Sequence, residues 1–217
     1  MGEPVMKTSL DARLLAAANL VRDGAYLADI GTDHAYLPIY LAQKGKISRA
    51  VASDIREGPL ARAEQNIRAA GLSDKIETVL TDGLSGLECY PITDIVIAGM
   101  GGLMIASILD AADFIRTTRT RLILQPMQHV SELRRYLSAG WQVEKEAITE
   151  EGGKLYQILC VRYDGVKRKP SELELLLGSY TLAHKREMPL FPILCERQAA
   201  VPVSYTHLRA HETCADL

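Results

Sequence analysis

Short apolar segments alternate with helix-like segments along most of this 217-residue chain. Four of the apolar segments each end in small or acidic residues, and they read YLADIG, AVASD, IETVLTD and DIVIAGMGG. A strand that is buried on both faces has such a continuous apolar run, and helices connect such strands into a parallel sheet. The alternation therefore predicts an α/β fold with a mainly parallel sheet.

Helical periodicity is found before and between these strands. An amphipathic helix is expected over residues 9–22, with Ser9 or Asp11 as its N-cap. Two further helices are expected over residues 35–44 and 57–70, because each lies between two of the apolar segments. The first three strands are then joined in sequence by helices, which is typical of connections between parallel strands.

The second half of the chain extends the sheet. A fifth strand is expected within residues 120–127, which contain RLILQPM, and a helix over residues 129–139. The following segment, WQVEKEAITEEGGKLYQILCVRY, reads as two strands joined by a Gly152-Gly153 turn. The predicted sheet therefore has seven strands, mainly parallel, with an antiparallel edge.

Composition and charge limit where such a chain can act. Hydrophobic residues make up 47% of it and charged residues 24%, which is typical of globular proteins. The longest uncharged run, Ile95–Leu109, is shorter than the ~20 residues that cross a bilayer. Asp11 and Arg13 interrupt any secretory signal near the N-terminus. We therefore expect a cytoplasmic protein that does not contact membranes.

The cysteines indicate neither a disulfide framework nor a zinc site. They are widely spaced and form no CxxC pair, and they are Cys89, Cys160, Cys195 and Cys214. Paired zinc ligands and disulfide frameworks both have characteristic spacings that are absent here. A reducing compartment and a protein without a bound metal are the expectation.

The net charge of −2 means that nucleic-acid binding would have to come from a local patch. Residues 116–135 are the candidate, with five arginines and one glutamate. The alternative is that these arginines belong to a solvated helix end and strand edge, and the sequence leaves both interpretations open.

The loop after the first strand indicates which cofactor the chain binds. The segment LADIGTDHAYLP, residues 27–38, passes from strand to helix through a single glycine, Gly31. A dinucleotide fingerprint needs glycine at two further positions, where this chain has Asp33 and Tyr36. S-adenosylmethionine has no phosphates, and its cationic methionine end suits a loop flanked by Asp29 and Asp33.

Carboxylates also follow the next two strands. Asp54 ends the second strand, where an acidic side chain can accept hydrogen bonds from both ribose hydroxyls. Asp82 follows the third strand and can accept from the exocyclic amine of adenine, with Ile55 or Leu84 beside the ring. A single aspartate at a strand end is typically a cap, but three at successive strand ends predict S-adenosylmethionine binding.

His34 and the end of the fourth strand can each be interpreted in more than one way. His34 is either a base or hydrogen-bond donor, or a structural partner at the start of a helix. The fourth strand ends in IAGMGG, residues 97–102, where Met100 is the one side chain able to contact a base. Its glycines can pack the next helix tightly, form a channel for a flat ring, or do both. Methyl transfer depends mainly on alignment, worth ~7–11 kcal/mol, so no strong acid–base pair is required.

Taken together, these motifs resemble the bacterial tRNA (adenine-22-N1)-methyltransferase family over roughly residues 7–190. The resemblance rests on DIGTDHAYLP (29–38), SDIREGPLARAEQNI (53–67), DGL (82–84), IVIAGMGG (95–102), LILQP (122–126) and GKLYQIL (153–159). It implies a class I (Rossmann-like) methyltransferase fold and S-adenosylmethionine as cofactor. It also implies methylation of N1 of an adenine in the D-arm of tRNA.

The matching positions imply a set of site residues. Those expected at the cofactor are Asp29, Gly31, Asp33, His34, Asp54, Ile55, Asp82, Gly83, Gly99 and Met100. Those expected at the substrate are Arg13, Gly101, Gly102 and Gln125, with Arg13 either touching phosphate or forming a surface salt bridge. Asp33 and His34 are the catalytic candidates, and Asp33 would stabilise the cationic product or take a proton from its amine.

Because N1 lies on the Watson–Crick edge, the base has to leave its stack, which costs a few kcal/mol. Binding of tRNA should weaken steeply with salt. Two alternatives stay open: a methyltransferase for a small molecule or a protein, and a non-catalytic nucleotide- or RNA-binding module.

The predicted domains are a methyltransferase domain at 1–168, a partial C-terminal helical region at 169–200 and a non-native tail at 201–217. Residues 171–191 resemble the start of a helical hairpin, whereas the tail has no helical or strand period. If the hairpin docks tRNA, this chain would bind cofactor but methylate poorly. The oligomeric state is left open, and a monomer is compatible with the sequence.

Overall fold

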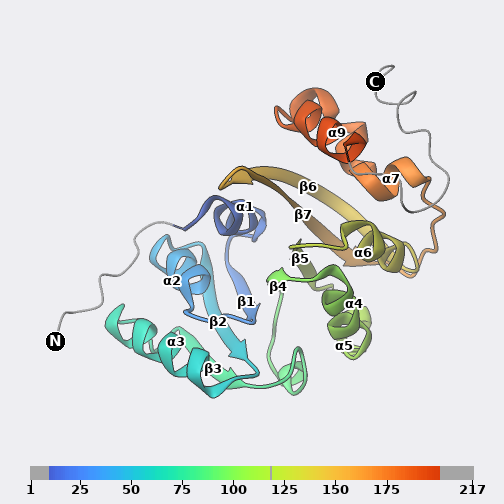
Figure 1. Cartoon of the computed structure of the whole chain (residues 1–217). Helices are drawn as coiled ribbons and strands as arrows, with labels where there is room; N and C mark the ends of the chain where they lie inside the picture. The colour runs from blue at the N-terminus through green and yellow to red at the C-terminus, as the bar shows by residue number, and fades with distance from the viewer. Residues whose placement is uncertain (1–9, 118, 201–217) are drawn as a thin grey trace.

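The computed structural model describes residues 10–117 and 119–200 (Figure 1). Seven strands form one sheet in the order β3-β2-β1-β4-β5-β7-β6. They are β1 (Ala25–Ile30), β2 (Ile47–Asp54), β3 (Ile76–Leu80), β4 (Asp94–Met100), β5 (Arg121–Pro126), β6 (Trp141–Glu151) and β7 (Lys154–Tyr163). The predicted tail, residues 201–217, lies outside the described residues.

Strands β1 to β5 are parallel, as predicted, because a helix or a longer connection lies between each pair. Strand β7 runs antiparallel to both β5 and β6. The antiparallel strand is therefore second from the edge, and β6 is the edge strand. The predicted Gly152-Gly153 turn joins β6 to β7, with φ angles of +56° and +74° that glycine adopts readily.

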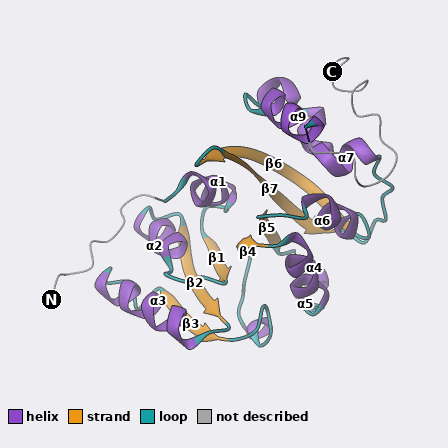
Figure 2. Ribbon diagram, in the orientation of Figure 1, coloured by secondary structure: helices purple, strands orange, loops and turns teal. Residues whose placement is uncertain are grey.

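Helices cover both faces of the sheet (Figure 2). Within the described residues they are α1 (Ala12–Leu20), α2 (Tyr36–Gln43), α3 (Glu57–Ala69), α4 (Gly102–Asp110), α5 (Phe114–Thr117), α6 (Val130–Leu137), α7 (Glu172–Leu177), α8 (Ser179–Ala183) and α9 (Phe191–Ala199). Short 3-10 turns are η1 (Leu87–Cys89) and η2 (Lys185–Glu187). Apolar residues of α1, α2 and α3 pack on one face, and those of α4, α5 and α6 on the other.

Asp11 is the N-cap of α1, and its Oδ1 accepts a hydrogen bond from the Leu14 amide at 2.7 Å. One of the two predicted caps is therefore confirmed. Helix α1 is shorter than expected because Val21 adopts an extended conformation at its end.

The strand order creates a switch point beside β1, which pairs with β2 on one side and β4 on the other. The chain moves outward from β1 to β3 and then crosses back to β4. The carboxyl ends of β1, β2 and β4 therefore diverge around a crevice, where ligands bind in open α/β sheets.

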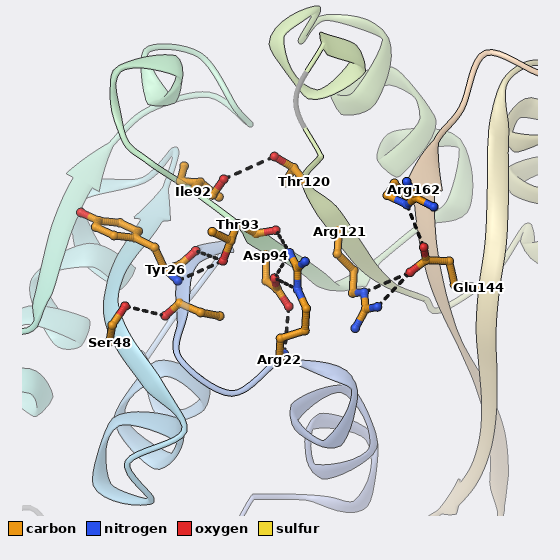
Figure 3. A network of polar contacts seen from close by, with 11 residues as sticks. Arg22, Tyr26, Ser48, Ile92, Thr93, Asp94, Thr120, Arg121, Glu144 and Arg162 are labelled. Atoms are coloured by element: carbon orange, nitrogen blue, oxygen red, sulfur yellow. Dashed lines mark hydrogen bonds and ion pairs between the residues drawn. The ribbon is translucent and has the colours of Figure 1, made fainter.

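A polar network lies at the opposite end of the parallel strands, where β4 begins (Figure 3). Asp94, at the start of β4, is fully buried and accepts hydrogen bonds from Arg22 N at 2.9 Å and Arg22 Nε at 2.7 Å. Arg22 Nη2 also donates to the Thr93 carbonyl. This network attaches the segment after α1 to the sheet, so Asp94 is a structural anchor far from the crevice.

Several arginines of the candidate patch, residues 116–135, are paired with acidic side chains. Arg121 pairs with Glu144 at 3.0 Å, and Arg134 is buried in an ion pair with Glu146 at 2.7 Å. Arg116 forms ion pairs with Asp110 and Asp113, each at 2.9 Å. Acidic side chains pair with these three arginines, which weakens the case for a basic patch, but Arg134 is buried and does not fit the alternative of a solvated helix end either.

The C-terminal region packs on the β6–β7 hairpin as several short helices (Figure 1). Gly178, with φ +94°, separates α7 from α8, so residues 171–191 do not form one long hairpin helix. A small apolar cluster that includes Leu177, Phe191 and Leu194 buries their inner faces. In the described part of the chain, no helix has the length and apolarity needed to span a bilayer.

Candidate active site

The loop after β1 is built around Gly31. Its φ is +73°, and a Cβ there would come 2.3 Å from Met100 Cε. Its amide donates to the Ser53 carbonyl at 2.8 Å, which joins the ends of β1 and β2. Asp33 and Ala35 also have positive φ angles, +48° and +56°, which cost roughly 1–2 kcal/mol each. The loop is therefore strained, as backbone at functional sites often is.

Two adjoining hollows lie at this end of the sheet. The first, here called the β2 hollow, is about 470 Å³ and lies at the ends of β1, β2 and β3. The second, called the α1 hollow, is about 350 Å³ and lies between α1 and the loop after β1. Both are lined by Gly31, Asp33, Ala98 and Gly99. One elongated molecule can therefore extend from one hollow into the other.

Asp54 and Asp82 line the β2 hollow together with Gly31, as their positions at strand ends predict. Asp54 is 6% exposed, and its Oδ1 accepts a hydrogen bond from the Arg56 amide at 2.9 Å. Asp82 is exposed. Ile55 also lines this hollow and is 61% exposed, which leaves an apolar side chain at its rim.

Asp29 lines the α1 hollow and is 6% exposed. Burial raises the pKa of its carboxyl to about 6, although the Thr32 hydroxyl, which donates to Oδ2 at 2.6 Å, acts in the opposite direction. An adjacent cation would favour the ionised form. The site is thus suited to a positively charged ligand group.

Asp33 and His34, the catalytic candidates, lie at the junction of the hollows and in the α1 hollow respectively. Asp33 is exposed and contacts Arg62 Nη2 at 3.2 Å and His34 Nε2 at 3.4 Å. The His34 ring stacks on Tyr36 with centroids 5.1 Å apart, and its carbonyl accepts from Asn66 Nδ2. These contacts favour a structural role for His34, and the catalytic roles stay predictions.

The residues predicted at the substrate have different environments. Arg13 lines the α1 hollow, whereas Gln125 is fully buried beneath it. A Cβ at Gly102 would come 2.2 Å from the His129 carbonyl oxygen, so this glycine allows close packing of α4. At Gly101 the nearest atom would be 3.6 Å away, in a flexible side chain. Gly101 therefore has the more open environment.

Several lining residues were not among the predicted ones. On α4, Met104 and Ile108 are four residues apart and both line the β2 hollow, a helical spacing that could have identified them. Ser53 also lines it, and its buried Oγ has no hydrogen-bond partner within the described residues. A serine in an apolar strand is the signal that the sequence offered there.

S-adenosylmethionine fits these residues. An unpartnered buried hydroxyl at Ser53 indicates a polar ligand in the β2 hollow, since buried polar groups are normally hydrogen-bonded. Asp54 and Asp82 supply acceptors there, and Asp29 supplies a carboxylate in the α1 hollow. Across residues 10–117 and 119–200, no three His, Cys, Asp or Glu side chains are grouped as metal ligands.

Comparisons with known proteins show what this chain is similar to. The family model of the methyltransferase domain matches residues 10–159. The tRNA (adenine(22)-N(1))-methyltransferase of Bacillus subtilis is 39% identical over 165 residues, which are 72% of this chain and 69% of that protein.

Solved structures extend the similarity. A Streptococcus pneumoniae protein in complex with S-adenosyl-L-methionine has a TM-score of 0.79 and 39% identity, covering 86% of each chain. The B. subtilis M1A22 tRNA methyltransferase TrmK has a TM-score of 0.78 and 30% identity, covering 97% of this chain and 94% of its own. These similarities confirm the resemblance and the class I fold predicted from sequence. The chain belongs to the tRNA (adenine-22-N1)-methyltransferase family.

Proposed function

We propose that this protein transfers a methyl group from S-adenosylmethionine to N1 of adenine 22 in the D-arm of tRNA. One observation carries the proposal. Asp29, Asp54 and Asp82 meet around two joined hollows at the switch point of the sheet, in a chain that belongs to this family.

Each carboxylate suits one part of the cofactor. Asp54 is buried at the end of β2 and would accept from the ribose hydroxyls. Asp82 lies at the end of the same hollow and would accept from the adenine amine, with Ile55 against the ring. Asp29 would accept from the ammonium of the methionine end in the α1 hollow.

S-adenosylmethionine supplies an electrophilic methyl group on a sulfonium that leaves as a neutral thioether. The protein has to hold N1 in line with the methyl carbon and sulfur, and such alignment is worth ~7–11 kcal/mol. The methylated adenine carries a positive charge. Asp33 lines both hollows and is the carboxylate that we assign to stabilising this charge.

An apolar rim beside the glycines of β4 suits a flat base. Leu103, Met104 and Met127 are 56%, 60% and 47% exposed. The Met127 amide donates to the Met100 carbonyl at 2.8 Å, so Met127, which follows β5, lies beside the end of β4. Exposed large apolar side chains of this kind can contact the face of an unstacked adenine.

The alternatives fit less well. In a dinucleotide-binding oxidoreductase, Asp33 and Tyr36 would stand where the pyrophosphate needs glycine. Similarity to tRNA methyltransferases favours tRNA over a small molecule or a protein as substrate. With tRNA as its substrate, the protein would act in the cytoplasm.

Transfer of labelled methyl from S-adenosylmethionine to tRNA transcripts tests the proposal. We expect 1-methyladenosine, identified by mass spectrometry of nucleosides, in a transcript with adenine 22 and none when guanine replaces it. Transfer should fall steeply between about 50 and 200 mM salt, because phosphate contacts release counterions. Equal methylation of both transcripts, or methylation of protein alone, would overturn the proposed substrate.

A further inference from the structure

Gln125 is completely buried, yet it connects two parts of the candidate site. Its Oε1 accepts hydrogen bonds from Arg13 Nη1 at 2.8 Å and from the Gly99 amide at 3.0 Å. Its Nε2 donates to the Pro126 carbonyl at 2.9 Å and lies 3.7 Å from Met127 Sδ. Both polar atoms of this amide are engaged within the protein, so Gln125 positions its neighbours and does not contact a ligand.

Arg13 is held from several directions. Its amide donates to Glu151 Oε2 at 3.1 Å, which fixes the start of α1 to the β6–β7 hairpin. Its Nη2 lies 3.3 Å from Asp11 Oδ2, and its side chain is 19% exposed. Its Nη1 would lie 3.2 Å from a Cβ at Gly99. The guanidinium therefore lies directly over Gly99, near the carboxyl end of β4.

This guanidinium has spare donors that line the α1 hollow. A guanidinium carries five N–H donors, and the contacts with Gln125 and Asp11 use two of them. Asp29, with its buried carboxylate, lines the same hollow. The hollow thus presents a fixed cation and a fixed anion to one ligand.

An α-amino acid group is the ligand chemistry that matches this pair, because its ammonium and carboxylate share one carbon. We propose that Arg13 binds the carboxylate of the cofactor's methionine end, and that Gln125 is the positioning residue that holds Arg13 there. A planar guanidinium matches a carboxylate through two parallel hydrogen bonds. The inference rests on the proposed function and replaces the phosphate contact, one of the two roles that the sequence left open for Arg13; the other, a salt bridge, is formed with Asp11.

The overall charge of the α1 hollow agrees with this assignment. Asp11, Asp29 and Asp33 face it as carboxylates, while Arg13 and His34 are the basic side chains among its described lining residues. S-adenosylmethionine has a net positive charge at neutral pH, which suits an excess of carboxylates. Its single carboxylate still requires a cation, and Arg13 provides it opposite Asp29.

Two ligands that differ in one group test the assignment of Arg13. Calorimetry on the whole chain compares S-adenosylmethionine with decarboxylated S-adenosylmethionine, which keeps the sulfonium and the ammonium. The wild-type protein should prefer the carboxylated ligand by roughly 10- to 100-fold, as hydrogen bonds to charged groups imply. Arg13→Met should remove this preference by weakening the carboxylated ligand alone. Arg68→Met, an exposed arginine of α3 paired with Glu64, is the matched control and should keep it.

Variants of Gln125 test the positioning role. Gln125→Met removes the acceptor for Arg13 and should reduce the preference several-fold, whereas Gln125→Glu retains an acceptor and should preserve most of it. In the Arg13→Met background, Gln125→Met should change the preference little, because both substitutions act through one interaction. A merely structural role would weaken both ligands equally, and thermal unfolding shows whether each variant is folded.

Other outcomes would overturn the inference in distinguishable ways. Equal weakening of both ligands by Arg13→Met would make Arg13 a structural residue. If Arg13→Met leaves the binding of both ligands unchanged and raises the KM for tRNA, Arg13 contacts a tRNA phosphate instead. A wild-type protein that binds neither ligand would overturn the proposed function, and this inference with it.

Discussion

Arg134 and Glu146 form a buried ion pair, with Nη2 of the arginine 2.7 Å from Oε1 of the glutamate. Their side chains are 6% and 1% exposed. Arg134 Nη1 also donates to the carbonyls of Leu175 and Leu176 at 3.1 Å each, and Glu146 Oε2 accepts from the Thr181 amide at 3.0 Å. One charged cluster therefore links α6, the edge strand β6 and the C-terminal helices.

Replacing Arg134 with methionine should destabilise the protein by about 3–5 kcal/mol, because Glu146 would remain buried without its cation. Urea unfolding followed by circular dichroism measures the free energy of unfolding. Arg135→Met is the control on the same helix: its partner Glu172 is 3.9 Å away and both side chains are more than half exposed. That change should cost less than about 1 kcal/mol. A double variant, Arg134→Met with Glu146→Leu, should recover part of the loss, and equal effects of Arg134→Met and Arg135→Met would contradict this account.

Gly101 and Gly102 should respond differently to alanine. At Gly102 the added Cβ would meet the His129 carbonyl oxygen at 2.2 Å, so Gly102→Ala should cost about 1–3 kcal/mol of stability. At Gly101 the nearest atom would be 3.6 Å away, so stability should change by less than about 0.5 kcal/mol. If Gly101 lines the path of the target base, its variant should bind S-adenosylmethionine normally while kcat/KM for tRNA falls. Unfolding curves, calorimetry and methyl transfer together separate packing from access, and normal tRNA methylation by Gly101→Ala would contradict the channel.

The carboxyl of Asp29 should make cofactor binding depend on pH. Burial raises its pKa from 3.8 to about 6, so the carboxylate that we propose binds the ammonium is lost as pH falls below about 6. The affinity for S-adenosylmethionine should therefore drop on acidification from pH 8 to pH 5. In Asp29→Asn the affinity should be low throughout and lose this dependence. Calorimetry from pH 5 to pH 8 measures the affinity for S-adenosylmethionine. A wild-type affinity that stays constant over this range would contradict the role of Asp29.

In the ligand-free protein, the carboxyl of Asp29 should make the free energy of unfolding depend on pH in the opposite direction to the cofactor affinity. Because its folded-state pKa lies above the ordinary value, protonated Asp29 stabilises the fold at low pH, and this contribution is lost as pH rises through about 6. Asp29→Asn should thus raise the free energy of unfolding at pH 8 by up to roughly 3 kcal/mol, and by less as pH approaches 4. Urea unfolding at several pH values measures this, with the exposed Asp74→Asn as a control. A destabilised Asp29→Asn at pH 8 would count against the assignment.

Asp54 should matter more for cofactor affinity than Asp82, because Asp54 is buried and would accept two hydrogen bonds, whereas Asp82 is exposed. Each bond to a charged group is worth about 1.5–3 kcal/mol, so Asp54→Ala should weaken S-adenosylmethionine by at least 100-fold. Asp82→Ala should weaken it by about tenfold. Asp54→Ala should also abolish binding of 5′-methylthioadenosine, which lacks the amino-acid end, whereas Arg13→Met should not. Similar losses for Asp54→Ala and Asp82→Ala would contradict this ranking.

Much of the sheet and the cofactor crevice could be predicted from local patterns. Buried parallel strands are continuous apolar runs, and their carboxyl ends share one edge of the sheet. Asp54 and Asp82 therefore had to lie near each other once their strands were recognised, and the structure has them in one hollow. The glycine pair at 152–153 likewise predicted its turn because the φ angles there favour glycine.

Tertiary contacts decided what the polar residues do. Gln125 lies near the carboxyl end of β5, as Asp54 does in β2, yet its side chain turns inward to Arg13, which is 112 residues away in sequence. Arg134 belongs to an arginine-rich segment, but packing of the C-terminal helices buries it against Glu146. Local periodicity reports which segments are buried and where they end. The partner of a side chain depends on elements that meet only after folding, so no local pattern contains it.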